Sequence, residues 1–390
     1  MLTYTELVML ERSLHNARVL SVYLDGTAED FAAQRAWRVQ LENSLKDLRA
    51  WLADSSHTER EQFEHCVTLL EEQLAPLSPG VGARGWVAFI TPEGVRVAER
   101  LPVQMPTMAV WSTGACVAPY IRALKQTRPV VVALADARKA TLYRYDREAL
   151  DKVKTIHAHA VLGPPLHMGD SPRVGFHPGV RGTTGRDAAQ RVLLQGTNRM
   201  LKEVSDQALR LAGTDGWILT GGIPGVSTHL AQSLADSAPG RVLDLESLDV
   251  HASEAEIAAA AEHGASTLRD ASDLRQIEDI MGNANGSGLV ALGPAETRHA
   301  LEQSRVRDLY LTHAFIEDHA ADAEDAVRKA LAQGALVEEV SREAARQLDG
   351  HGGMAARLRY RLPDVEPPTP EAEIDARSSV SPQGATAVPT

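Results

Sequence analysis

Five arginines gather in one stretch of the chain, between positions 173 and 199, where a single acidic residue accompanies them. Guanidinium groups bind phosphate oxygens through paired hydrogen bonds, so this stretch suits contact with a nucleic-acid backbone. Its first half is rich in glycine and predicts a mobile loop, whereas the spacing of Ala188, Val192 and Leu193 predicts a helix in the second half. An ordinary surface loop with solvated arginines is the alternative interpretation. The arginines are Arg173, Arg181, Arg186, Arg191 and Arg199, and the acid is Asp187.

The remainder of the chain is acidic, with a formal net charge of -12 over 390 residues. Proteins that coat nucleic acids or membrane surfaces depend on diffuse positive charge, so the composition argues against both classes. We therefore expect no DNA partner and no membrane partner, and any RNA contact must be local.

The cysteines and the N-terminal residues indicate the cellular compartment in which the protein is expected. Cys66 and Cys116 are the only cysteines and lie far apart in sequence, which excludes a disulfide framework or a thiolate zinc site and fits a reducing environment. Glu6 and Glu11 stand where a secretory signal needs a cationic start followed by an apolar run. The cytoplasm is the expected location.

Four histidines between positions 157 and 177 invite a metal-site hypothesis. Their spacing matches no closed metal site, and no pair lies at helical i and i+4 positions, so surface histidines are the favoured interpretation. His177, beside the arginines, could instead contact RNA with a charge that varies near neutral pH. We expect neither a metal nor a cofactor. The four are His157, His159, His167 and His177.

Other catalytic patterns are weak. A two-metal nuclease needs three or four converging carboxylates, and the expected strands supply mainly Asp136 and Asp244. The glycines at 286 and 288 precede an expected strand, whereas a dinucleotide-binding motif places its glycines after one. The residues from 221 to 228 lack the lysine of a phosphate-binding P-loop, and no Gly-x-Ser-x-Gly nucleophile motif occurs.

Hydrophobic spacing divides the chain into three α/β regions, 1–127, 128–282 and 285–362, followed by a proline-rich tail at 363–390 that is expected to be disordered. Ser253 and Glu256 form a capping box at the start of one long helix. Trp37, Trp51 and Trp86 are expected in the core rather than as base-stacking platforms. Helices are expected at 6–15, 30–53, 58–74, from the basic stretch to 211, and at 227–236, 253–280, 294–303 and 323–333. Strands are expected at 19–23, 85–90, 94–100, 129–135, 140–145, 216–220, 241–245, 289–292, 306–312, 336–340 and 354–360.

Several segments between 130 and 362 resemble the archaeal and eukaryotic class I release factor and Pelota family, in its bacterial branch of Balon-like ribosome hibernation factors. The most specific piece is Gly352-Gly353-Met-Ala-Ala-Arg-Leu-Arg-Tyr360, together with Gly286–Gly293 and Val306–Thr312. Val130–Tyr145 and Ile218–Gly222 are similar to the family's middle domain. The resemblance implies a small α/β N-terminal domain that faces the decoding site. It also implies a ribonuclease H-like middle domain and an α-β-α sandwich C-terminal domain resembling kink-turn RNA-binding ribosomal proteins.

The family's release chemistry depends on a Gly-Gly-Gln tripeptide, which this chain lacks. The matching loop runs from Gly182 to Gln190, with Gln190 five residues beyond Gly185. The resemblance therefore implies a Pelota-like hibernation factor acting under stress. Such a factor occupies the ribosomal A site near the peptidyl transferase centre, beside elongation factor Tu or another translational GTPase, and is not an enzyme. The expected RNA-binding residues are Arg173, His177, Arg181, Arg186, Gln190, Arg191 and Arg199.

Two alternatives remain open at this point. A peptidyl-tRNA hydrolase or rescue factor would use Gln190 or Gln195 to position water. An adaptor would bind a protein through its last domain, and its basic loop would have no role.

Overall fold

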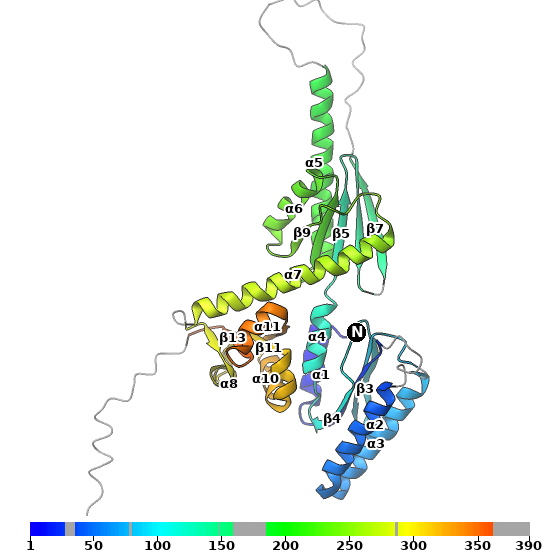
Figure 1. The fold of residues 1–390 in the computed structure, drawn as a ribbon, viewed down its shortest axis with the longest axis vertical. Helices are drawn as coiled ribbons and strands as arrows, with labels where there is room; N and C mark the ends of the chain where they lie inside the picture. Colours follow the sequence, from blue (N-terminus) through cyan, green and yellow to red (C-terminus); the bar gives the residue numbers. More distant parts are fainter. Residues whose placement is uncertain (28–35, 78–79, 148, 159–184, 285–287, 362–390) are drawn as a thin grey trace, which may run out of the picture.

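The computed structural model describes residues 1–27, 36–77, 80–147, 149–158, 185–284 and 288–361, without the side chains of 185–192. These residues form an α/β protein with three β-sheets, stacked into an elongated molecule (Figure 1). The expected disordered tail at 363–390 lies outside the described residues.

The first sheet has the strand order β3-β2-β1-β4. Alternate residues of β1 serve two cores: Leu20 and Val22 face the α2–α3 hairpin, whereas Val19 and Tyr23 face the opposite side, where α1 and α4 lie. The elements are α1 (Tyr4–Leu14), β1 (Arg18–Asp25), α2 (Ala36–Trp51), α3 (His57–Leu74), β2 (Gly85–Thr91), β3 (Gly94–Leu101), β4 (Met108–Thr113) and α4 (Ala118–Gln126).

The second sheet has the order β7-β6-β5-β8-β9, with β5, β8 and β9 parallel. On one face Val131 and Ala133 pack under α5 and α6, and on the other Val130 and Val132 pack under α7. The elements are β5 (Val130–Ala135), β6 (Lys139–Tyr145), β7 (Leu150–His157), α5 (Gly185–Ala212), β8 (Trp217–Gly222), α6 (Val226–Ser237), β9 (Val242–Asp244) and α7 (Glu254–Asn283).

The third sheet has the order β10-β13-β11-β12. One face joins the core beneath α1 and α4, so the first and third sheets share a hydrophobic cluster. The other face packs against α11 and the end of α7 through Ile277 and Ile280. The elements are β10 (Val290–Leu292), α8 (Pro294–Glu302), β11 (Val306–Thr312), α9 (His313–Asp318), α10 (Ala320–Ala332), β12 (Leu336–Val340), α11 (Arg342–Asp349) and β13 (Met354–Leu358).

Helix α7 connects the second and third sheets. Its 30 residues span about 45 Å. The first half covers β5 and β8 through Ile257 and Leu268, and the last turns reach the third sheet (Figure 1). The predicted capping box is confirmed, because Ser253 accepts from the Glu256 backbone N–H and Glu256 accepts from that of Ser253.

A buried cluster of four charges, here called the ionic junction, joins the three sheets. Lys125 Nζ of α4 lies 2.5 Å from Asp273 Oδ1 of α7 and 3.2 Å from Glu338 Oε2 of β12, and Arg128 Nη2 lies 2.7 Å from Glu338 Oε1. Asp273 is fully buried, and Lys125 is 6% exposed. Burial opposes the charge on Glu338, but Lys125 and Arg128 outweigh it and lower the pKa of that carboxyl.

The structure contains the predicted helices and strands, with differences at their ends, and it has five further elements. The sequence interpretation missed β4, α4, β7, α9 and α11. Trp37 and Trp86 are buried as predicted, but the prediction for Trp51 is wrong, because this residue is 62% exposed. The buried stripe of the hairpin passes through Leu45 and Leu52, and Trp51 lies about 100° away from Leu52 around the helix.

Candidate nucleic-acid interface

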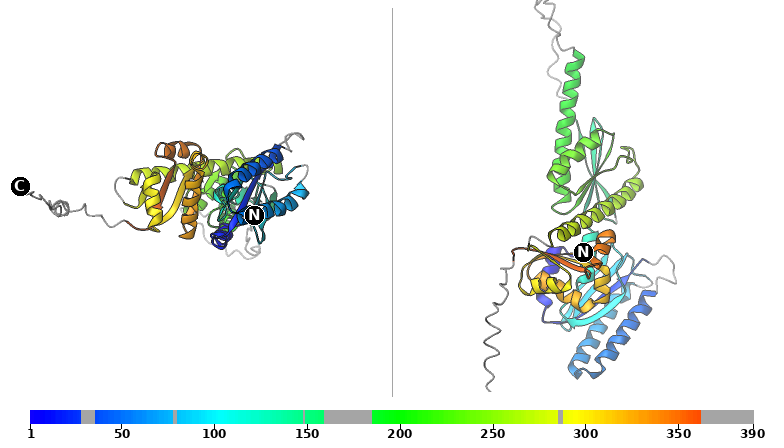
Figure 2. Two further views of the ribbon diagram at one scale, coloured as in Figure 1. Left: turned by 90° about the horizontal axis from the view of Figure 1, so that it is seen from below. Right: turned by 60° about the vertical axis from the view of Figure 1, so that its left-hand side comes forward.

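Helix α5 extends well beyond the sheet on which it lies. Its 28 residues span about 42 Å. Among the α5 residues whose side chains are described, 193–212, those in the hydrophobic core run from Met200 to Ala212 and so belong to the second half. Leu193 and Leu194, about two turns further out than Met200, are 58% and 57% exposed. Figure 1 and the right view of Figure 2 show the first half of α5 standing clear of the strands.

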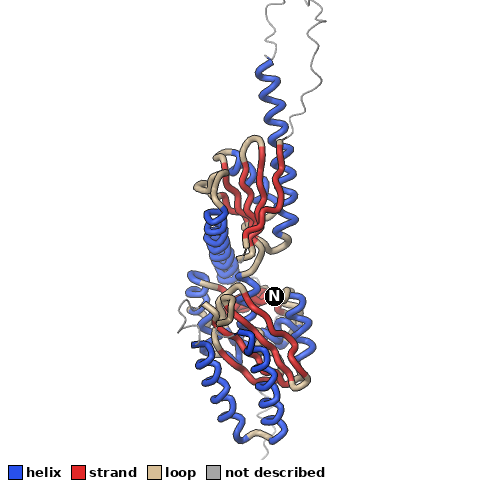
Figure 3. The backbone as a smooth tube through the Cα atoms, turned by 90° about the vertical axis from the view of Figure 1, so that its right-hand side faces the viewer, coloured by secondary structure: helices blue, strands red, loops and turns tan. Residues whose placement is uncertain are grey.

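The helix leaves the sheet at the turn between β5 and β6. Thr197 Oγ1 donates a hydrogen bond of 2.8 Å to the carbonyl oxygen of Ala137 in that turn. Gly196 is buried at the same level, so the helix backbone lies close to its neighbours there. Figure 3 shows the projection continuing past the ends of the strands. We call the part of α5 that precedes Thr197 the α5 projection.

Four exposed cationic or titratable side chains surround the base of the α5 projection. The turn places Arg138 and Lys139 beside Thr197, and the pairing of Lys139 with His157 brings the end of β7 to the same level. Arg199 follows two residues after Thr197 on α5. None of the four has an ion-pair partner within the described ranges. We call Arg138, Lys139, His157 and Arg199 the cationic collar, and all four are exposed.

The collar depends on a well-defined turn. Asp136 Oδ1 accepts hydrogen bonds from the backbone N–H groups of Arg138 and Lys139, at 2.6 and 2.8 Å. The Asp136 carboxylate is thus used within the turn, as in an Asx turn, and the two cationic side chains are left exposed. The Ala158 N–H donates to the Arg138 carbonyl oxygen at 2.7 Å, which ties β7 to the turn.

The expected RNA-binding residues fall into three groups. Arg173, His177 and Arg181 lie outside the described residues. Arg186, Gln190 and Arg191 lie in the α5 projection, where the structure describes the backbone only. Arg199 is exposed at the base of the projection, and it is the one expected residue whose side-chain surroundings the structure describes.

Arg138 and Lys139 were missed by the sequence interpretation. The signal that could have found them is the hairpin turn Asp136–Lys139, whose two cations follow a buried strand. Only the spatial contact between this turn and Thr197 shows that they adjoin the α5 projection.

The weaker catalytic hypotheses gain no support from the described residues. Asp244 accepts hydrogen bonds from the Thr220 and Thr228 hydroxyls at 2.8 and 2.9 Å, and Asp136 is occupied in its turn. Among the described residues, no group of three metal-ligating side chains gathers. Burial raises the pKa of the Cys66 thiol to about 11 and that of Cys116 well above its ordinary value, so neither thiol is an activated nucleophile.

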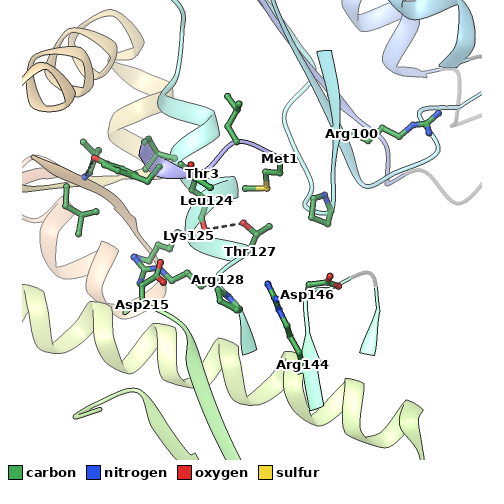
Figure 4. A pocket seen from close by; sticks show the side chains of 17 residues that line it. Met1, Thr3, Arg100, Leu124, Lys125, Thr127, Arg128, Arg144, Asp146 and Asp215 are labelled. Carbon is green, nitrogen blue, oxygen red and sulfur yellow. Dashed lines mark hydrogen bonds and ion pairs between the residues drawn. The ribbon is translucent and has the colours of Figure 1, made fainter. Parts of the chain in front are cut away.

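A cavity of about 520 Å³ lies where the three sheets meet (Figure 4). Lys125 and Arg128 line it, but both are paired within the ionic junction. Arg128 also approaches Asp215 at 3.9 Å. Lys125 and Arg128 therefore contribute to domain contacts, in contrast to the collar cations, whereas Arg100 and Arg144 of the same cavity are exposed.

In the described part of the chain, no helix combines the length and the apolar character needed to cross a membrane.

No protein-family model matches the chain, and no curated protein matches it. Solved structures match it at low identity. S. cerevisiae Dom34, a translation termination-like factor involved in RNA quality control and interacting with Hbs1, is 14% identical, with a TM-score of 0.43 over 62% of this chain and 67% of Dom34. Archaeal Pelota, in a ribosome-bound assembly with ABCE1, is 14% identical, with a TM-score of 0.41 over 72% of this chain and 78% of Pelota. An archaeal translation termination factor is 16% identical, with a TM-score of 0.25 over 92% and 99% of the two chains. The chain thus has a distant structural similarity to these proteins.

Proposed function

We propose that this protein is a cytoplasmic translation factor that binds the ribosome and occupies the A site, with the α5 projection directed at ribosomal RNA. The observation that carries the proposal is the projection itself. A helix of about 42 Å has its first half free of the sheet and unpaired cations at its base, in a chain whose net charge is -12.

The collar supplies the affinity in this proposal. Arginine and lysine side chains neutralise backbone phosphates and release condensed counterions, so binding weakens as salt rises. Arg186 and Arg191 belong to the same helix, and by sequence they give the α5 projection two arginines against one acid, Asp187. The acidic balance of the whole protein limits non-specific RNA binding, since negative charge repels phosphate.

The mechanism is steric occupation without a covalent step. The choice of the A site, near the peptidyl transferase centre, follows the sequence resemblance of the segments between 130 and 362. The same resemblance supports a hibernation role under stress, without peptide release. Dom34 is described as interacting with Hbs1 and archaeal Pelota as assembling with ABCE1. The sequence resemblance implies elongation factor Tu or another translational GTPase as the proposed partner.

The helical position of the two glutamines supports a non-enzymatic role. Gln190 and Gln195 both lie within α5, where backbone N–H groups are hydrogen-bonded along the helix. A helix interior therefore leaves those N–H groups unavailable for holding a reacting carbonyl or a water molecule.

The test is co-sedimentation of the full chain with bacterial ribosomes, at low and moderate salt, with the A site empty or filled by tRNA. We expect the wild-type protein to pellet, to be displaced by A-site tRNA and to dissociate as salt rises. The collar variant, Arg138→Gln with Lys139→Gln and Arg199→Gln, should bind at least about tenfold more weakly, because three phosphate contacts are removed.

The matched control removes three charges from exposed sites away from the collar: Arg12→Gln, Lys46→Gln and Arg210→Gln. It should bind like the wild type. Equal losses in both triple variants, or binding that A-site tRNA does not affect, would overturn the proposal. Peptide release that Gln190→Ala abolishes while binding persists would instead assign the protein to the hydrolases.

A further inference from the structure

A second concentration of arginine lies at one end of the two central strands of the third sheet, where β11 begins and β13 ends, and on the residues beside them. The two strands are antiparallel, and the Arg359 backbone N–H donates to the Arg305 carbonyl oxygen at 2.8 Å. The strand register shifts between Val306 and Asp308, and Asp308 then pairs with Arg357. Residues about 50 positions apart in sequence are therefore neighbours here. We call Arg305, Arg307, Arg357, Arg359 and Arg361 the arginine edge.

The arginine edge holds more positive charge than its paired acids neutralise. Arg307 pairs with Asp308 at 2.9 Å, and Arg357 pairs with Asp279 at 2.8 Å. Five guanidinium groups against two paired carboxylates leave an excess of three positive charges.

The exposed members of the arginine edge are available to a ligand. The Arg307 side chain is 55% exposed despite its ion pair. Arg359 is exposed and donates to the neutral carbonyl oxygen of Gln333 at 2.8 Å, so its charge is not compensated there. Arg361 is exposed and has no ion-pair partner among the described residues.

An aromatic ring stands within the arginine edge. Tyr360 is 53% exposed, and the guanidinium carbon of Arg305 lies 5.7 Å from its ring centroid. Arg305 itself is only 3% exposed, and its Nη2 donates to the Tyr360 carbonyl oxygen at 2.8 Å. The buried arginine thus fixes the position of Tyr360, while about half of the residue remains open to contact.

A cavity of about 240 Å³ adjoins the same edge. Arg307 and Arg357 line it, together with Asp279, which pairs with Arg357, and with Leu289. The cavity is smaller than those that enclose drug-sized ligands, and carboxylates already pair with both of its guanidinium groups, so the exposed arginines outside it are the main anchors for an anion.

We propose that the arginine edge binds single-stranded RNA, with phosphates on Arg359, Arg361 and Arg307 and one base stacked on Tyr360. An acidic peptide would also satisfy the charge, but it would leave the exposed ring without a planar partner. Cationic grooves with aromatic platforms are how proteins hold single strands with little sequence preference. The inference goes beyond the A-site proposal, since none of its residues belongs to α5 or to the cationic collar.

The experiment measures the binding of a short, fluorescently labelled, mixed-sequence single-stranded RNA by fluorescence anisotropy. It uses the full chain carrying the substitutions of Arg138, Lys139 and Arg199, so that these three collar cations contribute no binding. Adding Arg359→Gln and Arg361→Gln should weaken binding about tenfold and reduce the dependence on salt. Adding Tyr360→Ala should weaken binding about tenfold through lost stacking and leave the salt dependence unchanged.

The control adds Lys46→Gln and Arg210→Gln to the same parent and should change nothing, because neither residue lies near the arginine edge. Thermal unfolding of each variant checks that the fold persists. RNA binding that equals the parent in the Arg359/Arg361 variant overturns the inference. An acidic peptide that binds the parent more tightly than the RNA does, and loses that binding in the same variant, also overturns it and assigns the edge to a protein partner. Failure of ribosome co-sedimentation leaves this result unaffected, so the two proposals can fail separately.

Discussion

The cationic collar and the ionic junction contain similar cationic side chains in opposite surroundings. At the junction, Lys125 and Arg128 are largely removed from water, and carboxylates from two other elements neutralise them. At the collar, Arg138 and Arg199 are exposed, and no described residue pairs with either of them.

The difference shows why charge alone does not identify a functional surface. A buried charge without a partner costs several kcal/mol, so cations in the interior are found paired and their role is to fix geometry. An exposed cation loses little hydration when the protein folds, and without an internal partner it can interact with a ligand. The junction therefore orders the three sheets, whereas the collar cations remain exposed and available to a ligand.

The largest effect is expected from Lys125→Met, which breaks the junction. It leaves Asp273 fully buried without its cation, and removing one partner of a buried pair costs about 3–5 kcal/mol in free energy of unfolding. Urea unfolding followed by circular dichroism measures the loss. Lys46→Met, on the exposed side of α2, is the control and should stay within about 0.5 kcal/mol of the wild type. Equal stabilities for the two variants would show that the junction does not hold the sheets together.

A second prediction uses pH to separate paired from solvated carboxylates. The pKa of Glu338 is lowered in the folded state, so its charge stabilises the fold above the unfolded-state value of about 4.3. That contribution is lost as the pH falls through the folded-state pKa. Glu338→Gln should therefore have a lower free energy of unfolding than the wild type at neutral pH, and urea titrations should show this difference becoming smaller in acid. The control is Glu72→Gln, at an exposed position, which should match the wild type at both pH values. A difference for Glu338→Gln that stays constant with pH would contradict the lowered pKa of Glu338.

A third prediction isolates one collar residue. Arg199→Gln should leave the free energy of unfolding within about 0.5 kcal/mol of the wild type, because the side chain is exposed and unpaired. Ribosome binding, measured over a series of salt concentrations, should lose about one unit of the logarithmic salt slope if Arg199 contacts one phosphate. An unchanged slope would remove Arg199 from the interface.

The smallest effect on stability is expected from Trp51→Ala. This side chain is 62% exposed at the end of α2, so truncation creates no cavity and should cost less than about 0.5 kcal/mol. Thermal unfolding measures the change, with Trp37→Ala as the buried comparison. A loss as large as that of Trp37→Ala would mean that Trp51 is packed after all.

Much of the secondary structure could be predicted from local patterns. The helices that became α3 and α7 have apolar stripes at helical spacing, and the Ser253 capping box marked the start of α7. The strand β7 was missed because four consecutive residues of its eight are exposed. It therefore lacks the alternation of apolar and polar residues that predicts a half-buried strand. The helix α4 was missed because it is short and includes Lys125, whose burial depends on distant carboxylates.

The candidate interface could be predicted only in part. The arginine-rich stretch predicted a positively charged helix, which is α5. No local pattern shows that this helix extends past the ends of the strands. The collar also requires Ala137 and Thr197 to meet across 60 residues. The arginine edge depends in the same way on the pairing of β11 with β13.

The sequence by itself determined the acidic balance, the local concentration of arginine and the alternation of helices with strands, because these follow from composition and short-range periodicity. The tertiary structure alone decided which charges are neutralised. Lys125 and Lys139 are the same residue type, 14 positions apart in sequence. One is buried against Asp273 and Glu338, and the other is exposed beside α5. That distinction depends on which distant elements pack around each side chain, because solvation and the distance to an opposite charge together set its free energy.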